Sequence, residues 1–193
     1  MGVNPSLLLH PNIPKPLHGL APRKILGDDW WEKQRQLAYA RNDYHCWACG
    51  VHKRDAKYHK WLEAHEIYDV NYTIGRVKFE GVCALCHSCH NFIHSGRLSV
   101  LYQRGEIEKI KIMDILVHGF EVLKTARLNM NPFALRVMKE ISEPTFKKYL
   151  KYGFHEYGQC FAEWEDWHLV VNGKTYYSEF KSIKDWQKHY KYT

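Results

Sequence analysis

Apolar positions recur with a helical period over three stretches of the chain. Residues 106–127 carry apolar side chains mostly three and four positions apart, which predicts a strong amphipathic helix. Residues 131–153 predict a second helix, which begins at an Asn-Pro pair and is broken or kinked near Pro144. The stretch 27–43 predicts a third helix, because Asp28 can cap it and acidic residues occupy its first turn.

Alternating patterns predict strands in two other regions. Residues 57–82 alternate in part around a turn signal that ends at Gly75, so we expect two strands joined by a loop. Near the C-terminus, two β-rich runs flank Asn172 and Gly173, the dipeptide most typical of a hairpin. A last helix is expected to begin at Ser182.

The N-terminal stretch 1–26 has a different composition. Its five prolines remove backbone donors and bias the preceding residues towards extended forms, so we expect an extended arm without a stable helix. No run in the chain approaches the roughly 20 apolar residues of a membrane helix. The start of the chain also lacks the basic and apolar regions of an export signal. We therefore expect a cytoplasmic protein without a membrane partner.

Composition narrows the class of partner. The chain has 193 residues with 45% hydrophobic content, which suits one globular domain with an appendage. Its formal net charge is +7, and it carries 13 Tyr and 7 Trp. This balance favours a polyanionic partner with faces to stack on, namely nucleic acid, although basic proteins bind other partners as well.

Four of the six cysteines form two C-x2-C pairs, Cys46 with Cys49 and Cys86 with Cys89. In a reducing compartment such pairs are thiolate ligands more often than disulfides. Each pair can wrap one face of a tetrahedral ion, so the spacing predicts a structural zinc site. A redox dithiol is the alternative, but neither pair lies between the strand and the helix of a thioredoxin-like unit.

The remaining cysteines stand apart from these pairs. Cys83 could compete as a ligand, but its place in an apolar strand pattern suits a buried small side chain better. Cys160 has no partner in the sequence.

Three histidines suggest a second metal site. His90 and His94 lie four residues apart on a short helix expected from about residue 86 to residue 95, so their rings project from one face. His65, at the end of the first expected strand, is the third candidate ligand. Three imidazoles leave open the coordination positions that a catalytic metal requires. Other histidines near the motifs are interpreted as surface or supporting groups: His45, His52, His59 and His87.

The motifs CWAC, LEAHEI, LCHSCH and FIHSGR occur in this order between about residue 31 and residue 97. Together they resemble the HNH endonucleases of the zinc-containing, ββα-metal type, and the bare core is also similar to the colicin nuclease domains. The resemblance covers about a third of the chain.

The resemblance implies an α+β protein with a ββα-metal, treble-clef HNH core, a four-cysteine zinc site, flanking helices, and a C-terminal β-hairpin plus helix. It divides the chain into an extended arm (1–26), the nuclease core (27–103), a helical extension (104–155) and a small hairpin-helix module (156–193). That last module is a candidate for DNA docking, although its aromatic residues would equally serve to build a small core.

The resemblance also implies roles for individual residues. His65, His90 and His94 would hold a catalytic ion, which would be Mg²⁺, Mn²⁺, Ni²⁺ or Zn²⁺. Asn91 would help to position the ion or the backbone, and Arg97 would clamp a phosphate. Four further basic residues of the stretch 106–127 either flank DNA or form a solvated face: Lys109, Lys111, Lys124 and Arg127.

The chain departs from the family pattern at two positions. Glu66 stands where the general-base histidine should follow His65, and Gly81 replaces an asparagine ahead of the second cysteine pair. A carboxylate with a pKa near 4.3 is a weaker base than imidazole unless its surroundings raise that value. A shifted register would make His65 the base, but Ala64 would then fall at a ligand position.

The resemblance therefore implies a metal-dependent endonuclease that hydrolyses phosphodiester bonds in DNA, in a bacterial or phage-infected cell. The alternative is an HNH-fold factor with weak or no catalysis that binds nucleic acid or a protein partner, for example a phage inhibitor of a host system. An RNA-directed nuclease is a third hypothesis.

Overall fold

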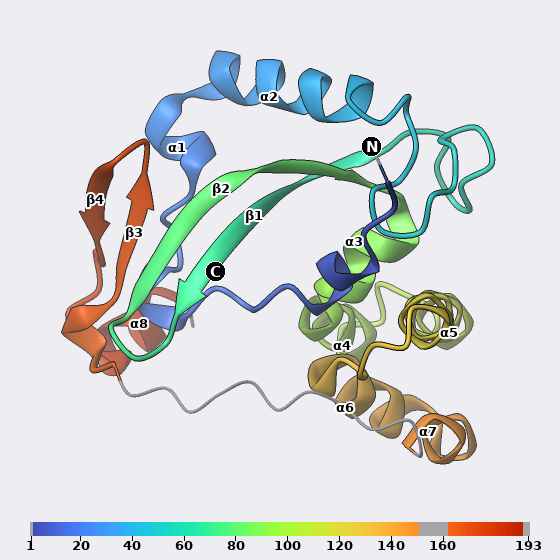
Figure 1. The fold of residues 1–193 in the computed structure, drawn as a ribbon. Helices are drawn as coiled ribbons and strands as arrows, with labels where there is room; N and C mark the ends of the chain where they lie inside the picture. Colours follow the sequence, from blue (N-terminus) through green and yellow to red (C-terminus); the bar gives the residue numbers. More distant parts are fainter. Residues whose placement is uncertain (1, 151–161, 191–193) are drawn as a thin grey trace. The chain divides into compact units, whose positions relative to one another are not determined.

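The computed structural model describes residues 2–150 and 162–190. Over these residues the fold is α+β, as expected, with eight α-helices and a mixed four-stranded sheet in the order β1-β2-β3-β4 (Figure 1). The chain divides into two compact units, each assembled from separate segments. The first unit comprises Met1–His10, Leu37–His65 and Cys83–Glu156, and the second comprises Pro11–Gln36, Glu66–Val82 and Tyr157–Thr193.

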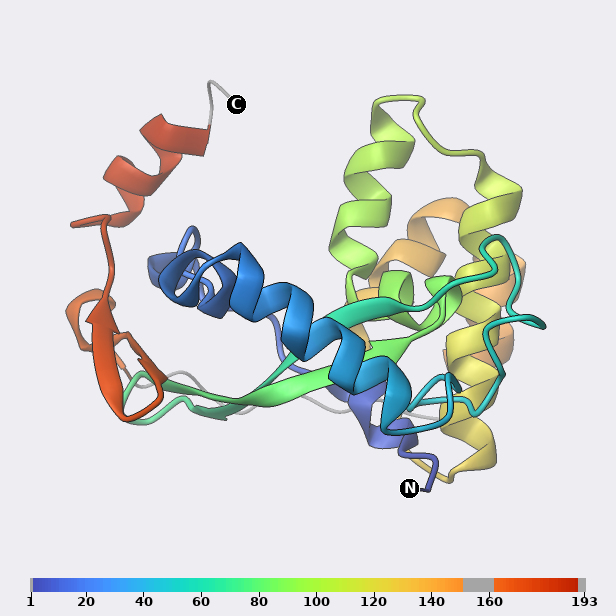
Figure 2. The same cartoon turned by 90° about the horizontal axis from the view of Figure 1, so that it is seen from above.

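The first unit is mainly helical. It contains the 3-10 helix η1 (Pro5–Leu9) and the helices α3 (His87–Ile93), α4 (Ser95–Gln103), α5 (Lys109–Thr125), α6 (Pro132–Ile141) and α7 (Glu143–Leu150). Helix α3 packs against α5 and η1, and α4 packs against α6. Figure 2 shows α4 and α5 side by side, joined by the loop between them.

The closest packing in the first unit lies between α3 and α5. Phe92 of α3 and Phe120 of α5 are both fully buried and meet edge to face, with ring centroids 5.2 Å apart. Gly119 makes this approach possible, because a Cβ atom at that position would overlap the Phe92 ring. The helix that carries the candidate metal ligands is therefore fixed on its apolar side by α5.

The helices predicted in this unit are confirmed, with one addition. The stretch 106–127 contains α5, which begins at Lys109 and ends at Thr125. The short helix after Cys86 forms α3, and α6 ends just ahead of Pro144. Asn131 caps α6, since its side chain accepts hydrogen bonds from the backbone of Phe133 and Ala134. Helix α4 was not predicted.

The second unit is built on the sheet. It contains most of β1 (Glu63–Asn71) and β2 (Arg76–Leu85), and all of β3 (His168–Val171) and β4 (Lys174–Tyr177). Its other elements are the 3-10 helices η2 (Lys15–Leu17) and η3 (Trp164–Asp166), and the helices α1 (Pro22–Leu26), α8 (Ile183–Tyr190) and the larger part of α2 (Asp28–Ala40). A buried cluster forms its core: Leu17, Val77, Trp167, Leu169 and Val171.

The predicted strands and the C-terminal hairpin are confirmed. β3 and β4 pair in antiparallel register on either side of Asn172 and Gly173, which both have positive φ, +50° and +75°. This is the conformation that a two-residue type I′ turn requires. β3 also pairs in parallel with β2, with Val77 opposite Leu169, and the hairpin thereby becomes part of the four-stranded sheet.

The expectation of no helix in residues 1–26 is wrong. η1, η2 and α1 all lie in this stretch, and each has a proline in its first turn. Proline is tolerated there because the first N–H groups of a helix have no partner within it. The division of the chain at residues 27, 104 and 156 stays a prediction. Cys160 and parts of the predicted extension and C-terminal module lie outside the described residues.

No helix in the described part of the chain is long and apolar enough to cross a membrane.

Candidate metal centre

The four paired cysteines converge on one point. Their sulfur atoms all lie within 4.8 Å of one another, and Cys49 Sγ and Cys86 Sγ are 3.8 Å apart. The first pair sits in a tight turn in which Gly50, with φ of +77°, donates its N–H to the Cys46 carbonyl. The second pair lies at the start of α3, where Cys86 is the N-cap residue and accepts the backbone N–H of His90.

The electrostatics of this cluster call for a cation. Hydrogen bonds from the other three thiols hold the pKa of Cys46 well below its ordinary value. The pKa of Cys49 is also lowered. The pKa values of Cys86 and Cys89 are raised, first by their hydrogen bonds to Cys46 and then by those to Cys49. Two of the four thiols therefore resist ionisation, and a dication would remove this conflict because it binds all four as thiolates. The four cysteines could hold a metal such as zinc.

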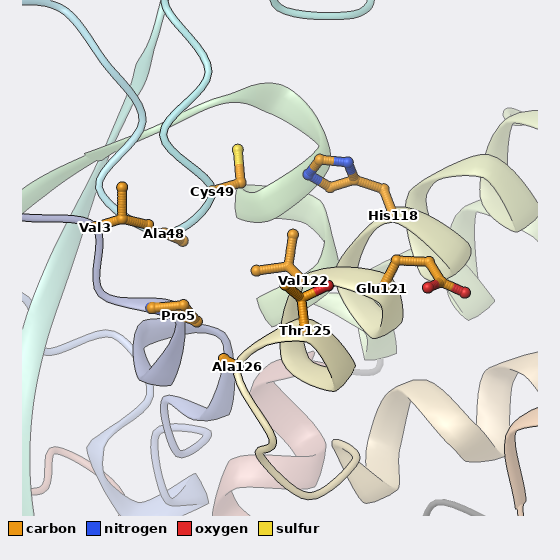
Figure 3. A pocket seen from close by; sticks show the side chains of 9 residues that line it. All are labelled: Val3, Pro5, Ala48, Cys49, His118, Glu121, Val122, Thr125 and Ala126. Atoms are coloured by element: carbon orange, nitrogen blue, oxygen red, sulfur yellow. The ribbon is translucent and has the colours of Figure 1, made fainter.

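His118 is a neighbour of the cysteine cluster that sequence analysis missed. Its Nε2 atom lies 3.3 Å from Cys89 Sγ. The ring comes from α5, and together with Cys49 it lines a pocket of about 610 Å³ whose other walls are largely apolar (Figure 3). A ring N–H directed at the sulfur would stabilise a thiolate. No local motif links residues 89 and 118, so only the packing of α5 on α3 brings them together.

The structure brings the three predicted histidine ligands together. His65 of β1, His90 of α3 and His94 at the end of α3 each offer a ring nitrogen, and these nitrogens lie within 4.8 Å of one another. The Nε2 atom of His65 is buried and has no hydrogen-bond partner. An unpaired buried nitrogen beside two other imidazoles fits a bound metal ion.

The protonation of this triad also suits metal binding. Burial lowers the pKa of His65 well below its usual value, and the nearby His94 ring lowers it further. Burial likewise lowers the pKa of His94 to about 4, with contributions from His90 and Arg97. Both rings are therefore neutral near pH 7, as ligation requires. His10 packs edge-on against His65, with ring centroids 5.1 Å apart.

Glu63 supports the triad from the same strand. It lies two positions before His65, and side chains two apart in a strand share a face. Its Oε2 atom lies 2.6 Å from His90 Nδ1, and its Oε1 atom lies 2.7 Å from His87 Nδ1. Burial opposes ionisation of this carboxyl, but the two histidine hydrogen bonds prevail and hold its pKa well below the usual value.

This contact determines which nitrogen of His90 faces a metal. Because Nδ1 is bound to the carboxylate, Nε2 is left as the ligand atom. Carboxylate partners of this kind orient metal-binding histidines in many proteins.

Glu63 also belongs to a third group, with His59 and His87. The three ligand atoms lie within 4.8 Å of one another. The group lines a pocket of about 450 Å³ whose walls also include Asn91, Arg97 and Lys111. Sequence analysis set His59 and His87 aside as supporting groups and assigned no role to Glu63. The spacing of Glu63 and His65 on one strand was the available signal.

The structure does not bring Glu66 into any of the three groups among the described residues. It follows His65 directly in β1, and consecutive side chains of a strand project from opposite faces.

The side-chain amide of Asn91 donates a hydrogen bond to the backbone carbonyl of His87, 2.9 Å away and one turn earlier in α3. Asn91 thus stabilises the helix that carries His90.

The predicted basic residues are spread out. Arg97 is exposed and lines the smaller pocket. Lys109 begins α5, whereas Lys124 and Arg127 lie at its far end, about 22 Å along the helix at 1.5 Å per residue. These three residues therefore do not form one patch around the pocket.

Comparisons with protein-family models, with curated proteins and with solved structures gave no match for this chain.

Proposed function

We propose that the chain is a metal-dependent endonuclease of the HNH type that hydrolyses phosphodiester bonds in DNA. The observation that carries this proposal is the convergence of His65, His90 and His94 beside a helix that begins in the four-cysteine cluster. The order of the motifs along the chain supports the same function.

Each metal group has its own task in this proposal. The four cysteines hold a structural zinc, which fixes the first turn of α3. The histidine triad holds one divalent ion, which supplies Lewis-acid stabilisation of the negative charge that develops on the phosphate. Imidazole donors suit Zn²⁺ and Ni²⁺ better than Mg²⁺, so the first two are the favoured ions.

The pocket beside the triad is the proposed phosphate site. Arg97 and Lys111 supply cationic groups on its lining, and Glu63 and His87 form the wall next to the triad. Arg97 can bind a phosphate through two parallel hydrogen bonds, while Lys111 acts as a point charge. The net charge of +7 favours the approach of a polyanion.

Two carboxylates, Glu63 and Glu66, are the candidates for the general base. Glu63 is a poor base because its pKa is held low and both its oxygens are engaged by histidines. Glu66 occupies the family position but lies outside the metal groups.

Glu66 therefore also favours a second candidate function, a DNA- or protein-binding factor without turnover. Binding by such a factor would survive His90→Ala.

Cleavage of supercoiled plasmid across Mg²⁺, Mn²⁺, Ni²⁺ and Zn²⁺ tests the proposal. Wild type is expected to nick the plasmid, and His90→Ala is expected to abolish nicking at equal folded zinc content. His189→Ala, a histidine change on exposed α8, is the matched control and should nick normally. Glu66→Ala tests whether Glu66 is the general base. Loss of nicking would assign the role of base to Glu66, and normal nicking would show that another group activates the water.

Absence of cutting by wild type on plasmid, single-stranded and branched DNA with all four ions would overturn the nuclease proposal. If DNA remained bound under those conditions, the binding factor would be the better description. A parallel digest of matched RNA and DNA tests the choice of DNA as substrate.

A further inference from the structure

One carboxylate lies between two groups of imidazoles in the first unit. Glu63 directs Oε2 to His90, a member of the histidine triad, and Oε1 to His87, which is not a member. Both contacts are short, 2.6 and 2.7 Å, so each carboxylate oxygen has a histidine partner. The carboxylate is thus placed to serve two sites at once.

His59 completes the group on the Oε1 side. Its ring lies 4.3 Å from the His87 ring, centroid to centroid, and stacks on Trp61 at 4.2 Å with only 9° between the planes. His87 is fixed by its place in α3, next to Cys86, and its ring also meets Tyr58 edge to face. The two imidazoles therefore have defined positions in the loop ahead of β1 and in α3.

We propose that His59, Glu63 and His87 hold a second divalent ion, which Glu63 binds through Oε1 while its Oε2 orients His90 of the histidine triad. Two imidazoles and a carboxylate are the protein ligands of well-known catalytic zinc sites, in which a coordination position stays open.

The second site is accessible to substrate. All three ligands line the 450 Å³ pocket and are only partly buried, so water and a phosphate oxygen can reach an ion there. Arg97 and Lys111 on the same lining offer charges to the remaining phosphate oxygens. The triad, in contrast, includes the fully enclosed His65.

The second ion would activate the attacking water, a step for which the proposed function has no assigned base. The chain has Glu66 where the family has its base histidine, and this carboxylate lies outside the three metal groups. A bound Zn²⁺ would lower the pKa of its water from 15.7 to about 7, so no protein base would be needed to activate that water. The inference rests on the proposed function for its first ion, but its test is ion binding and does not depend on DNA cleavage.

The experiment counts ions on the full chain. Protein with one zinc per chain in the cysteine cluster is dialysed against Mn²⁺, and bound Mn²⁺ is measured by elemental analysis. Electron paramagnetic resonance of the same samples separates protein-bound Mn²⁺ from free Mn²⁺. The variants are His59→Ala with His87→Ala for the second site, His65→Ala for the triad, and His189→Ala as the matched control. Zinc content and thermal unfolding confirm that each variant is folded.

Wild type and His189→Ala are expected to bind two Mn²⁺ ions per chain. The His59/His87 double variant and His65→Ala are each expected to bind one ion. A single Mn²⁺ in wild type that is lost only in His65→Ala would overturn the second site and leave the proposed triad intact. No bound Mn²⁺ in wild type would overturn both. Two bound Mn²⁺ ions without DNA cleavage would support this inference and count against the nuclease.

Discussion

Glu63 and His90 are joined by a 2.6 Å contact between the carboxylate Oε2 and the imidazole Nδ1. The contact links strand β1 to helix α3, and β2 lies between these two elements in the chain. It fixes the rotation of the His90 ring and selects the nitrogen that faces His65 and His94. The carboxylate is thus a positioning group for the candidate metal triad.

Removing the charge of Glu63 should weaken metal binding at the triad. Glu63→Gln is expected to lower affinity for Zn²⁺ or Ni²⁺ by about 10- to 100-fold, the usual effect of losing such a partner. Isothermal titration of protein that already holds its structural zinc measures this. Glu80→Gln, which removes a carboxylate paired with Lys78 on β2, is the control. Equal affinities in the two variants would show that the Glu63 contact has no role in binding.

The buried histidines make stability depend on pH when the triad holds no ion. His94 has a pKa of about 4 in the folded state, against about 6.5 when unfolded. Between these values the unfolded chain binds a proton that the folded chain does not, so stability falls as the pH is lowered. From pH 7 to pH 5 the loss from His94 is about 2 kcal/mol.

Urea unfolding at several pH values checks this slope. His94→Gln removes the titrating group, so its stability should fall less than that of wild type over the same interval. Parallel curves for the two proteins would contradict the assignment of a depressed pKa to His94.

Gly119→Ala should destabilise the first unit by about 1–3 kcal/mol, because the new methyl group would overlap the buried Phe92 ring. Gly96→Ala is the matched control. It is also a helical glycine, but it faces open space, so alanine should stabilise by up to about 1 kcal/mol. Chemical denaturation of both variants gives the comparison, and similar effects of both would argue against close packing of α3 on α5.

Loss of one cysteine ligand should remove the zinc and with it the order of the first unit. Structural zinc contributes about 10–16 kcal/mol in small zinc-binding peptides, which matches or exceeds the net stability of a typical domain. Cys89→Ser is therefore expected to lower zinc content well below one per chain and to lower the melting temperature. Cys83→Ala, at a buried cysteine outside the cluster, should keep its zinc. Elemental analysis measures the zinc content of each variant, and circular dichroism measures its melting temperature.

Arg97 and Lys111 should each contribute one phosphate contact. Replacing either with alanine is expected to weaken DNA binding and to reduce the slope of log affinity against log salt by about 0.9. Lys124→Ala, at the other end of α5, is expected to change the slope less. An equal effect at Lys124 would instead indicate that DNA contacts both ends of that helix.

Local signals predicted most of the elements correctly. Asn131 caps the start of α6 through its own side chain, and Asn172 with Gly173 forms the hairpin turn that this dipeptide favours. Such signals act over a few residues, so they can be recognised in the sequence alone. The parallel pairing of β3 with β2 joins residues about 90 positions apart, and no local pattern specifies it.

The candidate site shows the same limit. The cysteine pairs and the His90–His94 pair were visible as spacings within a few residues. The role of His59 was not visible in the sequence, because a loop that folds back beside α3 places its ring next to His87. Glu63 was overlooked for another reason: the family pattern directs attention to Glu66, whereas strand geometry places residues 63 and 65 on one face.

Helix α3 is only seven residues long, too short to persist in water by itself. Its first turn belongs to the cysteine cluster, and the next carries His90 and His94. During synthesis the upstream pair Cys46 and Cys49 emerges first, and the cluster can close only once Cys89 has left the ribosome. The histidine triad acquires its shape only after that. In the proposed function, zinc would therefore bind before the catalytic ion, and a cell short of zinc would accumulate protein that cannot bind the second ion.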